Sequence, residues 1–265
     1  MGARPDQDRA EASVAVFRLP VTGVAVAVRQ PDGADDVALL EAEPGGADLA
    51  LVARVAAAAA DGSPLDCSAL PVPDLEALVL VLRQIVLGDR VRAEVACPAC
   101  GARADISFGI AEYLTHHRPR PGRGVAAADA PGWLTLPGSA IRFRLPTVAD
   151  QGAAAATARP TRELVRRCLG DDVSGRVRRR VEAAMETLAP PLSRSLAAAC
   201  PECGMCFAVY FDVRSFVVRE LVDQAAFVYE DVHVLAARYH WSEARILAMP
   251  RRRRLRYAEL ASGAS

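Results

Sequence analysis

Lysine and asparagine are missing from this chain, and all 32 of its basic residues are arginine. Because alanine is abundant throughout, we attribute this bias to a GC-rich bacterial genome, so arginine content alone is no evidence for nucleic-acid binding. The patterns of an enzyme are also missing. The chain has no paired carboxylates at a strand end, no glycine-rich phosphate loop and no nucleophile with a nearby base. These absences predict a protein that is not an enzyme.

Long hydrophobic runs are absent too. The most apolar stretch, residues 75–87, is interrupted by Glu76, Arg83 and Gln84, and it is shorter than the ~20 residues that a membrane-spanning helix needs. The first eight residues are charged and carry no apolar segment of the signal-peptide type. We therefore expect a cytoplasmic bacterial protein with no membrane partner.

Hydrophobic residues make up 52% of the 265 positions, enough to build a core in one large or two small domains. The charges are divided unevenly along the chain. Residues 1–130 carry 12 arginines and 18 acids, whereas residues 131–265 carry 20 and 14, giving −6 and +6. This asymmetry favours head-to-tail contacts or acidic partners of the second half.

Two pairs of cysteines occur in the same short sequence motif. Cys97-Pro-Ala-Cys100-Gly recurs as Cys200-Pro-Glu-Cys203-Gly, and each pair lies between two runs that read as β-strands. In such a turn two thiolates point at one ion, and the glycine permits the positive φ that the turn needs. The sequence therefore predicts one closed structural Zn²⁺ site whose four ligands are Cys97, Cys100, Cys200 and Cys203. A closed site has no open coordination position for catalysis.

The cysteines allow other interpretations. Redox chemistry fits poorly because no βαβ unit of the thioredoxin type surrounds either pair, and the plain alternative is a set of unpaired buried thiols. Cys206 follows Cys203 by three residues and could replace a ligand. Cys67 and Cys168 read as core or loop residues.

The two halves resemble each other beyond the cysteines. Residues 104–110 lie over 207–213 at a shift of 103, and residues 29–35 match 144–150 at a shift of 115. We use the name knuckle for each Cys-x-x-Cys turn, and knuckle hairpin for the β-hairpin that carries it. We infer a diverged tandem duplication in which each half consists of a strand, a turn, helices, a knuckle hairpin and a helix, in that order. Chance similarity between two unrelated zinc knuckles is the alternative. If the hairpins pack about a pseudo-two-fold axis, the zinc fastens the halves together.

The expected organisation is α+β. We predict β-hairpins over residues 14–29, 90–108 and 196–213, and a strand over 141–145. Helices are expected from Asp35 or Asp36 to about Glu43, over Leu49–Ala60 with Asp48 as cap, and from Asp74 to Gly88. The predicted segments are a flexible tail (1–13), a first repeat (14–118), a linker (119–132), a second repeat (133–214) and a helical C-terminal segment (215–265).

The C-terminal segment carries an apolar stripe at three- and four-residue steps from residue 215 to about 240, which predicts one long amphipathic helix. Ser242 is the expected N-cap of a short helix to Met249. Pro250 then opens another helix, which carries Arg251–Arg254 and Tyr257.

Residues 227–257 resemble the C-terminal signature of the T-even-type bacteriophage baseplate family, which is encoded with contractile tails and phage-tail-like contractile injection systems. The resemblance rests on a helix, the Tyr-His-Trp-Ser turn at 239–242, the Ile-Leu-Ala-Met-Pro step at 246–250 and the Arg-Arg-x-x-Tyr end. It covers about thirty residues well and the knuckle-containing body loosely. It implies a baseplate or hub component, or an assembly chaperone for one, which could reside in an assembled particle.

The resemblance also implies a docking face for other baseplate or hub proteins, in which aromatic and arginine side chains favour concentrated binding energy. The main rival is a zinc-ribbon protein that binds nucleic acid through its basic C-terminal tail. Against this rival, the hairpin stretch 104–108 contains no cation. The residues expected on the docking face are Val218, Val222, Tyr229, Tyr239, Trp241, Arg251, Arg254 and Tyr257.

Overall fold

The structure is a computed structural model that describes residues 14–43, 45–122, 125–169 and 173–263. The predicted tail over residues 1–13 lies outside the described residues. The fold combines helices with four small antiparallel sheets, as the α+β prediction required. None of the described helices is both long enough and apolar enough to cross a bilayer.

Ten strands and eleven helices are described. The strands are β1 (Val14–Arg18), β2 (Ala25–Arg29), β3 (Ala56–Ala58), β4 (Arg90–Ala96), β5 (Arg103–Gly109), β6 (Ala126–Ala127), β7 (Trp133–Thr135), β8 (Arg142–Arg144), β9 (Arg194–Ala199) and β10 (Cys206–Phe211). The helices are α1 (Gly33–Leu40), α2 (Ala47–Val55), α3 (Val72–Leu87), α4 (Ile110–His116), α5 (Val148–Ala155), α6 (Pro160–Leu169), α7 (Gly175–Leu188), α8 (Val213–Ala225), α9 (Val228–Tyr239), α10 (Glu243–Leu247) and α11 (Arg251–Ala261).

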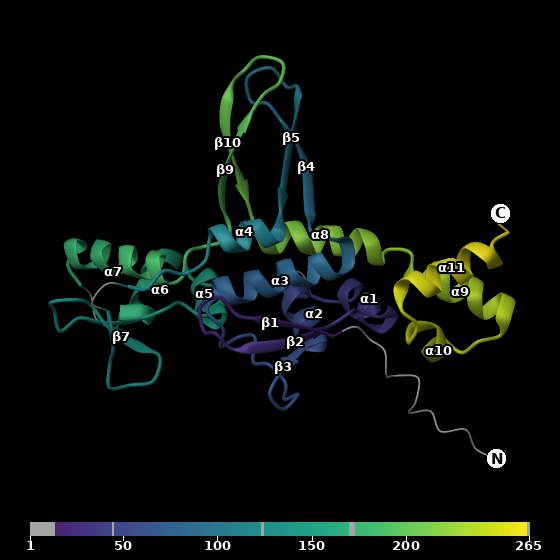
Figure 1. Ribbon diagram of the computed structural model, residues 1–265, viewed down its shortest axis with the longest axis horizontal. Coiled ribbons are helices and arrows are strands. Elements are labelled where there is room, and N and C mark those ends of the chain that lie inside the picture. Colours follow the sequence, from purple (N-terminus) through teal and green to yellow (C-terminus); the bar gives the residue numbers. More distant parts are fainter. Residues whose placement is uncertain (1–13, 44, 123–124, 170–172, 264–265) are drawn as a thin grey trace.

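Helix α3 forms the centre of the main core. Every residue from Pro73 to Arg83 is buried, because sheet β1–β2–β3, helices α2 and α4, and helix α8 surround it (Figure 1). Asp74 does not cap this helix as predicted. Pro71 occupies the N-cap position, and the Asp74 carboxylate instead accepts hydrogen bonds from the backbone N–H groups of Val21 and Thr22 at 2.7 and 3.0 Å. A buried acid of α3 thereby holds the β1–β2 turn.

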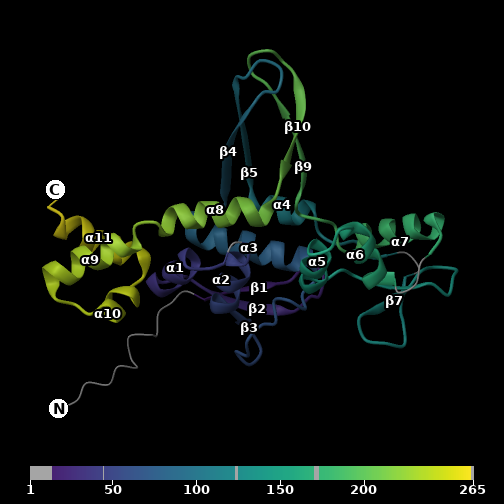
Figure 2. The ribbon, with the colours of Figure 1, turned by 180° about the vertical axis from the view of Figure 1, so that it is seen from behind.

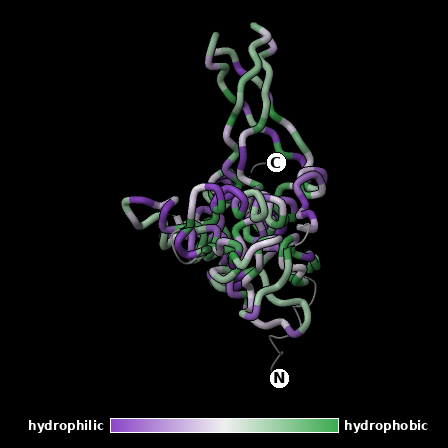
Figure 3. Tube along the Cα trace, turned by 90° about the vertical axis from the view of Figure 1, so that its left-hand side faces the viewer, coloured by the Kyte–Doolittle hydropathy of each residue, from purple (hydrophilic) through white to green (hydrophobic). Residues whose placement is uncertain are grey.

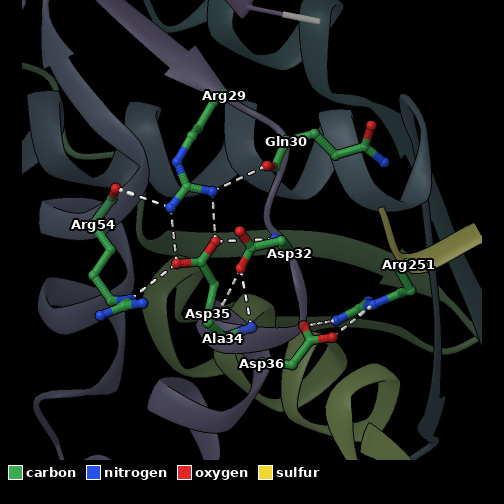
Figure 4. Close-up of polar contacts among 8 residues, drawn as sticks. All are labelled: Arg29, Gln30, Asp32, Ala34, Asp35, Asp36, Arg54 and Arg251. Atoms are coloured by element: carbon green, nitrogen blue, oxygen red, sulfur yellow. Dashed lines mark hydrogen bonds and ion pairs between the residues drawn. The ribbon is translucent and has the colours of Figure 1, made fainter. Parts of the chain in front are cut away.

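Helix α1 begins at a capping box, in which the cap and the third helical residue exchange hydrogen bonds. The cap is Asp32, so the prediction of Asp35 or Asp36 was wrong; Asp35 is the third residue and accepts from the Asp32 N–H at 3.0 Å. Arg29 at the end of β2 holds the Asp35 carboxylate with both Nη atoms, at 2.6 and 2.9 Å (Figure 4). The carboxylate therefore joins strand and helix.

The next helix also differs from its prediction. Helix α2 starts at Ala47 with Gly46 as N-cap, not Asp48, and it stops at Val55. Residues 56–58 then form β3, which pairs with β2 and completes the sheet. Because alanine favours helix, the sequence of residues 56–60 predicts helix. In the structure the open edge of β2 offers hydrogen-bond partners to residues 56–58, and these residues form a strand instead.

The second half repeats the arrangement of strand, arginine and capping box. Thr147 caps α5 and exchanges hydrogen bonds with Asp150, the third residue of that helix. Arg144 at the end of β8 grips the Asp150 carboxylate with both Nη atoms, and its Nη2 lies 2.8 Å from Oδ1. Within the predicted linker, residues 126–127 form strand β6, which joins β7 and β8 in one sheet.

Two hairpins project from the body on the side opposite to sheet β1–β2–β3 (Figures 1 and 2). β4 pairs with β5 and β9 pairs with β10, each in an antiparallel register, as predicted. Hydrophobic residues run along these ribbons, outside the compact body (Figure 3). Between the ribbons is a cavity of about 230 Å³ lined by apolar side chains that include Val95, Ile106, Phe108, Leu196 and Val209.

The predicted long helix over residues 215–240 was wrong, because the chain breaks between α8 and α9. The two parts of the apolar stripe face different partners. Val217, Leu221 and Ala225 of α8 pack in the main core, whereas Leu235 of α9 packs with Ile246 in a separate C-terminal cluster. Helices α10 and α11 occur where they were predicted, with Ser242 accepting a hydrogen bond from the Arg245 N–H at 3.4 Å.

A third cluster lies at the opposite end of the molecule from α9–α11 (Figure 1). It is built from β7, β8, α6 and α7 around Leu136, Phe143, Leu169 and Val181. We call these elements the α6–α7 unit. The second half therefore does not close on itself, because its residues Val148, Phe211 and Val213 belong to the main core while the α6–α7 unit has a core of its own.

Candidate metal centre

The first cysteine pair lies in the turn at the tip of the β4–β5 hairpin. The Cys97 N–H donates to the Ala102 carbonyl at 2.8 Å, and the Gly101 N–H donates to the Cys97 carbonyl at 2.9 Å. Gly101 has φ 74°, in the left-handed region that glycine reaches without a Cβ penalty. The turn therefore needs the glycine that follows the second cysteine.

The second pair repeats this geometry at the tip of the β9–β10 hairpin. The Cys200 N–H donates to the Met205 carbonyl at 2.9 Å, the Gly204 N–H donates to the Cys200 carbonyl at 3.0 Å, and Gly204 has φ 70°. Both knuckles thus present their sulfurs from the same backbone conformation.

The two knuckles meet. The Cys97 Sγ lies 3.7 Å from the Cys203 Sγ, the Cys100 Sγ lies 3.6 Å from the Cys200 Sγ, and all four sulfurs lie within 4.8 Å of one another. A tetrahedral ion with Zn–S bonds of about 2.3 Å requires S···S separations of about 3.8 Å. The four predicted ligands are therefore close enough together to hold one metal ion.

The cluster is two-sided in its exposure. Cys97 and Cys200, the first residue of each pair, are 2% and 3% exposed, whereas Cys100 and Cys203 are exposed. In both short contacts the first cysteine of one pair meets the second cysteine of the other, at 3.7 and 3.6 Å. The distances and the burial are therefore nearly the same for the two hairpins, as a two-fold axis between them would require. The first cysteine of each pair is therefore shielded from solvent, and the second cysteine of each pair is open to it.

Electrostatics at the cluster favour a cation. Backbone N–H groups of Cys100 and Ala99 lower the pKa of the Cys97 thiol to about 7. At Cys100 the Ala102 N–H lowers the pKa of the thiol. The neighbouring Cys203 and Cys200 thiols together raise this pKa by more, so it lies at about 12. Without a cation the sulfurs compete for protons, whereas a divalent ion would lower the pKa of all four together.

The remaining cysteines lie elsewhere. Cys67 is buried in the main core, and desolvation by burial raises the pKa of its thiol. Burial likewise raises the pKa of Cys168, at the end of α6, to about 11. Cys206 is exposed and stands opposite Ala199 in the β9–β10 register. Among the described residues, the cluster that could hold a metal consists of the four predicted cysteines without Cys206.

The residues expected on the docking face are distributed differently from the prediction. Arg254 is only 1% exposed and binds Asp36 and Asp231 at 2.7 and 2.9 Å, and Arg251 also binds Asp36. Val222 packs against the main core. These arginines hold α11 onto the body instead of facing outward, a role that needs acids far away in the sequence.

The aromatic residues of the C-terminal segment form a cluster. Tyr239 stacks on Trp241 with ring centroids 4.8 Å apart, and the rings of Tyr257 and Trp241 are nearly perpendicular with centroids 5.2 Å apart. Arg245 lies over the Trp241 ring. Tyr229 is 48% exposed and donates a hydrogen bond to Glu41 at 2.9 Å. Phe227, which the sequence reasoning left out, is 60% exposed at the break between α8 and α9.

No family model, curated protein or solved structure matches this chain.

Proposed function

We propose that the chain is a non-enzymatic structural or assembly component of the baseplate of a contractile phage-tail-like injection system. The observation that carries the proposal is the segment 227–257, which resembles the baseplate family. Its aromatic residues gather into a partly exposed cluster at one end of the molecule. The centre of four thiolates fits a structural role, because a closed site activates neither water nor substrate.

The proposed metal is Zn²⁺. Four thiolates in tetrahedral reach of one point suit zinc or iron, whereas oxygen-loving cations such as Mg²⁺ and Ca²⁺ are disfavoured. A two-stranded ribbon is marginally stable by itself, and here two ribbons meet at their tips through the cysteines. The ion therefore fastens the far ends of the ribbons, while the main core holds their bases.

The duplication remains a proposal with structural support. Arg29 and Asp35 in the first half, and Arg144 and Asp150 in the second, make the same two-pronged contact between a strand end and a capping-box helix. In each half a hairpin, helices, a knuckle hairpin and a helix follow one another. Two unrelated zinc knuckles would not bring this second correspondence with them.

The proposed docking face for other baseplate or hub proteins is narrower than the eight residues named from the sequence. It consists of the contacting rings of Tyr239, Trp241 and Tyr257, together with Phe227 and Tyr229, which are exposed at the start of α9. Large aromatic side chains are the type that contributes most to binding energy. Arg251 and Arg254 hold α11, the helix that carries Tyr257, onto the body.

The test compares point variants in cells that make the contractile particle. Phe227→Asp combined with Tyr239→Asp should leave the chain folded and zinc-loaded but reduce particle assembly about tenfold or more. Val16→Asp, which changes an exposed apolar residue on β1 that belongs to no proposed binding surface, tests whether the loss is specific to the C-terminal face. Normal particle numbers in the double variant would contradict the proposal. Deleting residues after 249 is a poorer test, because it would strip Asp36 and Asp231 of their partners.

The alternative is a zinc-ribbon protein that binds nucleic acid through the basic tail, and fewer arginines are available for this binding than the sequence suggested. Two of the four consecutive arginines are used internally, so this function would depend on Arg252, Arg253 and Arg256. Tight DNA or RNA binding by the intact chain, with a steep dependence on salt, would make it the better account.

A further inference from the structure

A groove of about 730 Å³ lies at the base of the second hairpin, between the main core and the α6–α7 unit. Val72 and Pro73 of α3 and Val218 of α8 line one wall, and Leu164 of α6 and Met185 of α7 line the other. Its volume lies in the range of pockets that bind ligands or side-chain anchors, and it lies between two units, where such pockets are common.

The charged residues of the groove are mostly acidic. Four acids and one arginine line it, for a formal charge of −3: Asp48, Glu76, Glu186, Asp212 and Arg214. Arg214 pairs with Asp48. Glu76 is 4% exposed, and the donors that it binds, the backbone N–H groups of Leu192 and Ser193 and the Ser193 hydroxyl, are neutral. Glu76, Glu186 and Asp212 therefore give the apolar groove a negative potential.

The groove continues upward onto the outward face of the second hairpin. Tyr210, 65% exposed, lines the groove, and Met205 at the hairpin tip is 45% exposed. Between them the outward positions are all uncharged: Ser195, Ala197, Ala199, Cys206 and Ala208. The surface that leads from the tip to the groove therefore carries no charge to keep it solvated.

The first hairpin provides an internal comparison. Its six outward positions, matched in register at a shift of 103, carry four charges: Arg92, Glu94, Arg103 and Asp105, with Ala96 and Ser107. Both hairpins expose these positions, yet only one of them is charged. Monomeric proteins rarely leave a continuous apolar surface without a use, so the difference marks the second hairpin as the covered one.

We propose that this groove and the outward face of β9–β10 bind a cationic, partly apolar segment of another protein. Apolar side chains of that segment lie against Tyr210 and the alanines, and an arginine or lysine enters the groove beside Glu186 and Asp212. A negatively charged segment would be repelled by the same acids. This inference does not depend on the baseplate proposal, because it uses a different face of the molecule.

The test is photo-crosslinking in the cells that naturally make the chain. A benzophenone amino acid replaces Tyr210 in one variant and Ser107, the matched position of the first hairpin, in another. The adduct at position 210 should form about tenfold more efficiently than at 107, and its mapped peptide should carry arginine or lysine beside apolar residues. Zinc content and circular dichroism of each variant show that it is folded.

Charge reversal supplies the control. Glu186→Arg in the groove should lower the adduct yield at position 210 about fivefold. Glu182→Arg, one turn earlier on α7 and outside the groove lining, should change it by less than about twofold. The proposal is overturned if position 210 gives no adduct, if positions 210 and 107 give the same adduct, or if both reversals act alike. It is equally overturned if the adduct is a second copy of this chain, a nucleic acid or an acidic peptide.

Discussion

The guanidinium of Arg254 donates to the carboxylate of Asp36, 218 residues earlier in the chain, with Nη2 2.7 Å from Oδ2. Both side chains are almost fully buried, at 1% and 3% exposure. The same guanidinium reaches Asp231 through Nε at 2.9 Å. One arginine from a run of four therefore joins the last helix to the first helix and to α9.

Arg254→Ala should destabilise the docked C-terminal helices by about 3–5 kcal/mol, because removing one partner of a buried ion pair leaves the other charges uncompensated. Chemical denaturation followed by tryptophan fluorescence measures the change, since Trp241 contacts Tyr257 of α11. Arg252→Ala, at an exposed neighbour, should cost less than about 0.5 kcal/mol. Equal effects of the two substitutions would show that the burial of Arg254 has no energetic weight.

Cys203→Ser should lower the zinc content from one ion per chain to nearly none, because three thiolates are left where the closed site needs four. Elemental analysis of protein expressed with zinc supplied gives this number. Hydrogen exchange should become fast in both ribbons and stay slow in α3, since the main core does not depend on the tip. Cys206→Ser, three residues away and outside the cluster, should keep the full zinc content. A Cys203→Ser protein that still holds one zinc per chain would refute the shared site.

Asp150→Asn should reveal a stabilisation that depends on pH. The Arg144 guanidinium, with help from the Thr147 N–H and hydroxyl, holds the pKa of the Asp150 carboxyl well below its usual value of 3.8. A carboxyl whose pKa is lower in the folded chain than in the unfolded chain stabilises the fold at pH values above its pKa in the unfolded chain. This contribution is lost as the pH falls through its pKa in the folded chain.

At pH 7 the Asp150→Asn variant should therefore be less stable than the natural chain by about 2–3 kcal/mol. The gap in the free energy of unfolding should shrink as the pH falls below about 4. Asp105→Asn, on the exposed face of β5, serves as the control and should change stability by less than about 0.5 kcal/mol. A gap that stays constant down to pH 2 would show that the ion pair is not its source.

His240→Gly should stabilise the chain by about 0.5–1 kcal/mol. His240 ends α9 in the left-handed conformation, at φ 54°, and it is the one described residue other than glycine with positive φ. Glycine reaches this conformation without the Cβ clash and is the usual residue at that position. Ala237→Gly, in the interior of the same helix, should instead cost about 1 kcal/mol. Thermal unfolding of the two variants decides between opposite shifts in midpoint.

The parts of the fold that follow from local pattern were predicted, including the hairpins, the knuckle turns and the four cysteines. A two-residue alternation and a Cys-Pro-x-Cys-Gly turn carry their geometry within a few residues. The parts that depend on distant partners were missed. Asp32, Asp35 and Asp36 can each cap a helix by composition, and the choice is made by Arg29 and Arg251. The apolar stripe of residues 215–240 is continuous in the sequence, but periodicity cannot tell that its two halves face different cores.

The spacing of the cysteines also sets an order of events during synthesis. Cys100 and Cys200 meet in the centre although they lie 100 residues apart. At about 5–20 residues per second, the first knuckle leaves the ribosome some 5–20 s before its partner. Throughout that interval it offers two thiolates and no more. The ion can be enclosed only once the second knuckle has emerged, so the centre cannot close before Cys203, its last ligand, has been translated.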